Sequence, residues 1–69
     1  KIPPRAQAVG VSIMNLGLTE HCVIAAVIRK GEVTVPRGVT VLEAGDEILA
    51  ITDQAGASRL AELLRARED

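Results

Sequence analysis

Three carboxylates lie close together at one point of the chain, and residues of this type could bind a cation. Glu43, Asp46 and Glu47 surround Gly45 in the stretch VTVLEAGDEILAI. A calcium loop needs a longer run of oxygen ligands than these three side chains supply. Gly45 suits the third position of a type II turn, which requires positive φ, and Asp46 can accept hydrogen bonds from nearby backbone N–H groups. The stretch therefore favours a turn over Glu43–Asp46, with a cation site as the alternative.

His21 and Cys22 are the residue types of a zinc site or of a nucleophile and its base. Neighbouring residues at the start of a strand point to opposite faces of the sheet. Zinc needs about four ligands, and the chain has one cysteine and one histidine. We expect an exposed histidine beside a small buried thiol. Since no nucleophile–base pair appears elsewhere, we do not expect an enzyme.

Arg29, Lys30 and Arg37 are basic residues that a hairpin and a following turn would bring near each other. Three charges without a glycine-rich phosphate loop are usually ordinary solvated side chains, and we favour that interpretation. The alternative is a small anion site, in which an arginine pairs with a phosphate through two hydrogen bonds.

The composition excludes several classes of function. The chain of 69 residues is 48% hydrophobic, contains no Phe, Tyr or Trp, and has a net charge of −1. Nucleic-acid binding normally needs a basic face and, for single strands, aromatic stacking platforms. The longest apolar run, Val23 to Ile28, is far shorter than the roughly 20 residues of a membrane-spanning helix. A single cysteine fits a reducing compartment, so we expect a cytoplasmic domain without membrane insertion.

The first half of the chain predicts a linker and three short elements. The proline-containing residues 1–9 suggest a linker before a domain at 10–69. Residues 11–18 predict one or two helical turns that begin near Ser12 and stop at Gly17. The stretch CVIAAVIR, residues 22–29, predicts a strand, and Lys30-Gly31 then predicts a tight hairpin into the strand EVTV.

The second half predicts one more strand and a closing helix. Pro36 and Gly38 suit the second and fourth positions of a turn. The stretch EILAIT, residues 47–52, predicts a strand. A helix is expected over 54–67, with Asp53 or Thr52 as its N-cap. Its buried side is predicted to carry Ala57, Leu60, Ala61 and Leu64, and its outer side Arg59, Glu62 and Arg65.

Both long strands are apolar on their two faces. In the strand at 22–29, simple alternation places Val23, Ala25 and Val27 on one face and Ile24, Ala26 and Ile28 on the other. The fold class is therefore α+β: a small, mostly antiparallel sheet with a short N-terminal helix and a C-terminal helix. One helix cannot cover both faces of that sheet. We expect a homodimer that covers the remaining apolar face, either sheet against sheet or sheet against helix.

Taken in order, these elements resemble the TrkA C-terminal domain, also called the C-terminal RCK domain (regulator of potassium conductance). The resemblance covers about residues 10 to 66. It rests on Leu16-Gly17-Leu18, the apolar strand Val23 to Arg29, the turn Lys30-Gly31, Val33 to Pro36, Leu42 to Asp46, Glu47 to Thr52 and the last helix.

The resemblance implies a cytosolic regulatory domain of a potassium channel, potassium uptake system or cation/proton antiporter. It also implies a homodimer that binds a small effector, such as cyclic di-AMP, at the dimer interface, and a membrane transport subunit as partner, in the same chain or another. The implied ligand residues are Cys22, Val23, Ile24 and Pro36, with Arg29 or Arg37 supplying charge; Cys22 stands where nucleotide-binding members carry Asn. The alternative function is a dimerisation and coupling module that binds no small molecule.

Overall fold

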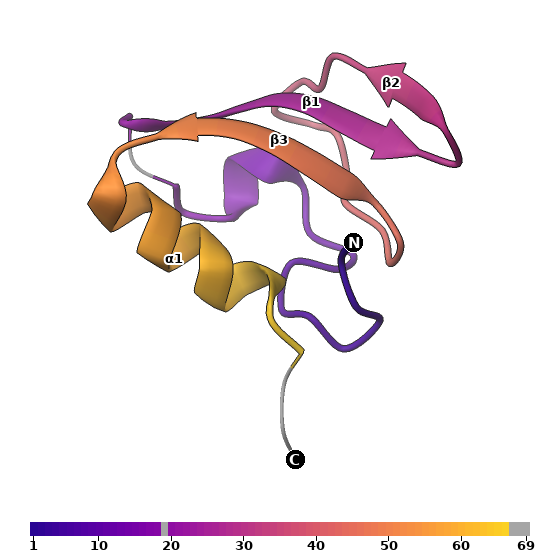
Figure 1. The fold of residues 1–69 in the computed structure, drawn as a ribbon, viewed down its shortest axis with the longest axis horizontal. Coiled ribbons are helices and arrows are strands. Elements are labelled where there is room, and N and C mark those ends of the chain that lie inside the picture. Colours follow the sequence, from indigo (N-terminus) through magenta and orange to yellow (C-terminus); the bar gives the residue numbers. More distant parts are fainter. Residues whose placement is uncertain (19, 67–69) are drawn as a thin grey trace.

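A computed structural model describes residues 1–18 and 20–66 of the chain. It contains a three-stranded antiparallel sheet of order β2-β1-β3, formed by β1 (Cys22–Arg29), β2 (Glu32–Thr34) and β3 (Glu47–Thr52). A 3₁₀ turn, η1 (Ile13–Asn15), precedes the sheet, and the helix α1 (Gln54–Leu64) follows it (Figure 1). The α+β class is confirmed, with the expected N-terminal helix reduced to a single 3₁₀ turn. No helix in the described part of the chain has the length and apolar character to span a bilayer.

Strand β1 contains a β-bulge that changes which residues face the core. Its ladder with β3 shifts register between Ile24 and Ala26, so that Ala25 is an extra residue. Ile24 and Val27 are therefore both buried. Simple alternation, which placed Val27 on the same face as Val23, is wrong beyond residue 24, because a bulge inverts the alternation of the residues that follow it.

The hairpin between β1 and β2 forms as predicted. Lys30 and Gly31 both have positive φ, at 52° and 79°, as a two-residue type I′ turn requires. The turn at Glu43–Asp46 is also confirmed, because Gly45 has φ of 88° and the Asp46 N–H donates to the Glu43 carbonyl over 3.2 Å. The turn expected over Pro36–Gly38 lies later in the chain: Thr40 N–H donates to the Arg37 carbonyl over 3.0 Å.

Helix α1 begins at the predicted N-cap, where the Asp53 carboxylate accepts a hydrogen bond of 2.8 Å from Gly56 N–H. Its buried residues are Gly56, Leu60 and Leu63. Of the residues predicted to be buried, Leu60 is correct, Ala57 and Ala61 are exposed, and Leu64 is half-buried. The buried side of the helix is therefore shifted by one residue from the prediction. Gly56 packs so closely on the sheet that a Cβ there would collide with Thr52 Oγ1. The helix ends at Leu64; of the predicted extension, Arg67 lies outside the described residues.

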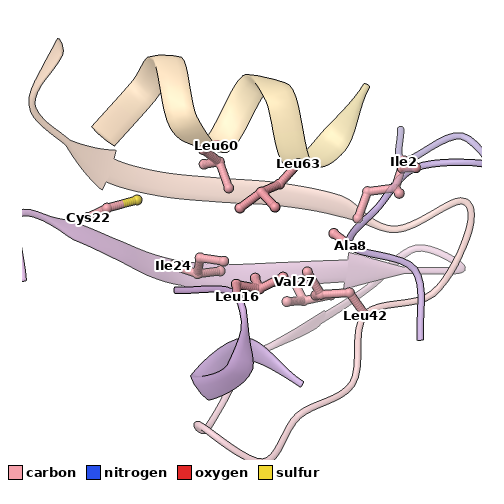
Figure 2. Packing of buried hydrophobic residues seen from close by; sticks show 10 residues of the cluster. Ile2, Ala8, Leu16, Cys22, Ile24, Val27, Leu42, Leu60 and Leu63 are labelled. Carbon is pink, nitrogen blue, oxygen red and sulfur yellow. The ribbon is translucent and has the colours of Figure 1, made fainter. Parts of the chain in front are cut away.

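The segment expected to be a linker packs into the core. Ile2, Ala6 and Ala8 are buried together with residues of β1 and α1 (Figure 2). Ile2 also exchanges backbone hydrogen bonds with the second turn, from Ile2 N–H to Asp46 O at 2.8 Å and from Gly45 N–H to Ile2 O at 2.7 Å. Residues 1–9 are thus part of the packed structure, and the prolines exclude a helix there without preventing burial.

The two faces of the sheet differ. Helix α1, η1 and the N-terminal segment all lie on one side of it (Figure 1). On the other side, cross-strand neighbours Val23 and Ile51 are 55% and 70% exposed, and Leu49 on β3 is 60% exposed. We call the surface formed by Val23, Val33, Leu49 and Ile51 the open face. The expectation of one covered and one uncovered apolar face is therefore met within the described chain.

Candidate functional site

A cavity of about 290 Å³ lies between the start of β1, the region of η1 and the loop that follows β2. It brings together all the predicted ligand residues except Arg29. The lining residues are Ile13, Met14, Leu18, Cys22, Val23, Ile24, Pro36, Arg37 and Gly38. Sequence reasoning placed Ile13, Met14 and Leu18 in a helical segment but did not assign them to the site, because their approach to the loop depends on tertiary hydrogen bonds.

Those hydrogen bonds tie two walls of the cavity to each other. Met14 N–H donates to the Gly38 carbonyl, and Ile13 N–H donates to the Thr40 carbonyl, each over 2.9 Å. The loop is also held internally, since Arg37 N–H donates to Thr40 Oγ1 over 2.9 Å. The rim that carries Arg37 is therefore anchored by backbone interactions and does not depend on the Arg37 side chain.

The third wall is the first part of β1. Cys22 and Ile24 are buried, whereas Val23 is exposed on the open face and also lines the cavity. Cys22 is a free thiol and His21 is exposed, as predicted. Within residues 1–18 and 20–66, no group of three His, Cys, Asp or Glu side chains is placed to hold a metal ion.

Arg37 supplies the only charged side chain among the described residues of the cavity lining. Among the residues that the structure describes, its guanidinium has neither a hydrogen-bond nor an ion-pair partner. An arginine beside an apolar cavity, with its donors unused, can pair with an anionic ligand in a bidentate manner.

Arg29, the other predicted charged ligand, is used inside the fold. Its Nε and Nη2 donate to Asp46 Oδ1 and Oδ2, both over 2.7 Å, and Nη1 donates to Glu43 Oε2 over 2.8 Å. Nη2 also reaches the Val41 carbonyl at 3.0 Å. The structure does not bring Arg29 into the cavity lining with Arg37.

Asp46 is the buried end of this ion pair, with 1% of its surface exposed. Its Oδ2 accepts from Glu43 N–H over 2.9 Å, which is the predicted turn hydrogen bond. The hydrogen bond from Arg29 holds the pKa of Asp46 below its usual value, although burial acts in the opposite direction. The same hydrogen bond raises the pKa of Arg29. With Arg29 across both of its oxygens, Asp46 is a structural carboxylate and not an open cation ligand.

Comparison with known proteins agrees with this architecture. The chain is 40% identical over 47 residues to the Trk system potassium uptake protein TrkA homolog of Archaeoglobus fulgidus. That alignment covers 68% of this chain and 11% of the relative, so the chain corresponds to a small part of it. A solved structure titled "Structure of RCK domain with cda" shares the fold, with a TM-score of 0.77 over 93% of both chains at 22% identity. Because residues 1–65 also match the TrkA-C domain model, the chain belongs to the TrkA-C domain family.

Proposed function

We propose that this chain is a cytosolic regulatory domain of a potassium or other monovalent-cation transport protein, and that it senses a small anionic effector in the cavity beside Arg37. Membership of the TrkA-C family supports the regulatory role, and the name of the Archaeoglobus relative supports the link to potassium uptake. The domain acts as a binding module and not as an enzyme. Its partner is a membrane channel, uptake or antiporter subunit, in the same chain or another.

The position of the unpaired Arg37 guanidinium at an aliphatic cavity is the observation that carries this proposal. A solvated surface arginine contributes little to the stability of the fold. Beside a cavity, however, it can bind the charged group of an anion while the rest of the ligand is removed from water inside the cavity. Arg29 cannot take this role, because all of its nitrogens are engaged by Asp46, Glu43 and the Val41 carbonyl.

The second half of the proposal is a homodimer formed through the open face. Exposed aliphatic side chains of adjacent strands make a surface that a second copy, related by a two-fold axis, would cover with the same residues. Val23 belongs both to this face and to the cavity lining. A ligand that orders Val23 would therefore change the stability of the dimer, which gives a route from effector to transport protein.

Sedimentation equilibrium tests the dimer. We expect the parent chain to dimerise and Ile51→Glu to be monomeric, because a charge at the centre of an apolar interface is left desolvated and unpaired. Ala57→Glu, on the exposed side of α1, is the matched control and should remain dimeric. A monomeric parent at high micromolar concentration would contradict this part of the proposal.

Effector sensing is tested by thermal shift and calorimetry with cyclic di-AMP, mononucleotides and monovalent or divalent cations. A ligand that binds only the folded state at a hundredfold excess over its Kd stabilises it by about 2.7 kcal/mol. The alternative function, a coupling module without a ligand, needs only the exposed aliphatic residues of the open face. A dimeric parent that responds to none of these compounds would support that alternative.

A further inference from the structure

We propose that the ligand of this cavity is an aliphatic monoanion, with a carboxylate head at Arg37 and a hydrocarbon body against the cavity walls. This inference rests on the effector site proposed above and names the chemical class that the site would take. It follows from the side chains that the cavity offers and from those that it lacks.

Most of the side chains in the cavity lining are apolar, and they come from three parts of the chain. Ile13 and Met14 come from η1, Leu18 from the segment after it, Val23 and Ile24 from β1, and Pro36 from the loop. Such walls favour hydrocarbon through the area that they remove from water. The chain contains no Phe, Tyr or Trp at all, so a nucleobase would find no aromatic ring on which to stack.

The polar side chains in the lining also limit which ligands can bind. Among the described residues of the lining, the Cys22 thiol is the only side-chain hydrogen-bond donor besides Arg37, and it is a weak one. None of these described lining residues is Asn, Gln, Ser, Thr, Asp or Glu. The donors and acceptors of a nucleobase edge would lose water without gaining side-chain partners, which weakens binding. A hydrocarbon body loses no hydrogen bonds on entry.

The charge of the cavity points to a single negative group. One guanidinium, exposed at the rim, offers two parallel N–H donors to a carboxylate, and no acidic side chain among the lining residues that the structure describes competes for them. A volume of about 290 Å³ is at the lower end of the roughly 300–1,000 Å³ range of small-molecule pockets. The site therefore suits a short, amphipathic monoanion whose head stays near water while its body packs toward Ile24.

Calorimetric titration with octanoate tests the proposal, with octanamide as the uncharged match and acetate as the match without a hydrocarbon body. We expect saturable binding of octanoate, weaker binding of octanamide and none of acetate. Arg37→Gln should weaken octanoate binding by about tenfold, equivalent to ~1.4 kcal/mol. Arg59→Gln, on the outer side of α1, is the control and should bind like the parent. Amide NMR shifts on binding should concentrate at Val23, Ile24 and Gly38.

The possible outcomes separate this inference from the proposed function. Absence of saturable octanoate binding overturns the inference, and so does binding that Arg37→Gln leaves unchanged. If cyclic di-AMP binds and depends on Arg37 while octanoate does not bind, the ligand class is wrong and effector sensing stands. If no anion binds, both are wrong. Binding of octanamide as tight as that of octanoate would show that the charge at Arg37 selects nothing and would also overturn the inference.

Discussion

Two turns of the molecule, Glu43–Asp46 and Arg37–Thr40, present charged residues in opposite ways. In the first, the Asp46 carboxylate is buried and bound across both oxygens by Arg29. In the second, the Arg37 guanidinium is exposed beside a cavity and unpaired among the described residues. The backbone of the second turn is held by Thr40 instead.

The difference separates a structural charge from an available one. Arg29 and Arg37 are the same residue type, and both were candidates for the same ligand. Their roles differ because the Arg29 guanidinium has a carboxylate partner, whereas the Arg37 guanidinium has none among the described residues. A buried carboxylate must be paired, and Asp46 therefore takes the donors of the arginine that reaches it. The arginine without such a carboxylate is left for a ligand. The following predictions test this contrast, from the largest expected effect to the smallest.

Asp46→Ala should destabilise the fold by ~2–4 kcal/mol, because it removes both carboxylate oxygens of a buried, bidentate pair and the acceptor of Glu43 N–H. Urea unfolding followed by circular dichroism measures the change. Glu43→Ala is the control: Glu43 is 61% exposed at its side chain, so its ion pair with Arg29 should matter by less than about 1 kcal/mol. Equal effects of the two substitutions would show that burial does not distinguish these carboxylates.

Gly45→Val should cost about 1–3 kcal/mol, since a β-branched residue is strained at a φ of 88°. A Cβ at this position meets no atom within 4 Å, so the cost arises from the backbone and not from a clash. Gly38→Ala provides the matched test in the other turn. Gly38 does not have positive φ, and its added Cβ would lie at an ordinary 3.4 Å from Met14 Cβ, so the variant should melt close to the parent. A Gly38 variant as unstable as the Gly45 variant would contradict the contrast.

Acidification should change the stability of the fold least near neutral pH, and the loss of stability should grow as the pH falls. The pKa of Asp46 is lowered in the folded state from its ordinary value of 3.8, chiefly by the hydrogen bond from Arg29. The folded state therefore binds this proton less tightly than the unfolded state. The stability that the pair contributes is complete above the unfolded pKa and is lost as pH falls through the folded pKa. The difference in stability between the parent and Asp46→Asn should shrink in acid; a difference that stays constant into strong acid would show that folding does not change the pKa of Asp46.

Local chemistry explains which parts of the fold were predictable from sequence. Gly31, Gly45 and the Asp53 cap each act through their own backbone or through residues three positions away, and all three were identified correctly. The apolar strands at 22–29 and 47–52 were also correct, because both are rich in β-branched residues.

The predictions were wrong where contacts with a distant part of the chain determine the local structure. The bulge at Ala25 is set by pairing with β3, and the buried side of α1 is set by the close approach of Gly56 to Cys22 in β1. The burial of Ile2 depends on hydrogen bonds to residues 45 and 46, which no pattern within residues 1–9 indicates. In the candidate site, the β1 and loop residues were assigned from the family resemblance. The sequence did not show that Arg29 lies outside the cavity that Arg37 lines, because Asp46, the partner of Arg29, lies 17 residues away in the sequence.

The bulge in β1 shifts the alternation of side chains along the strand. A strand alternates its side chains between two faces, and one extra residue shifts everything beyond it by half a period. Without the bulge, the same residues with Cys22 and Ile24 at the cavity would turn Arg29 toward the open face, and Asp46 would stay buried without its cation. Deletion of Ala25 should instead leave Arg29 in place, because the remaining residues then alternate regularly and keep Ile24, Val27 and Arg29 on one face.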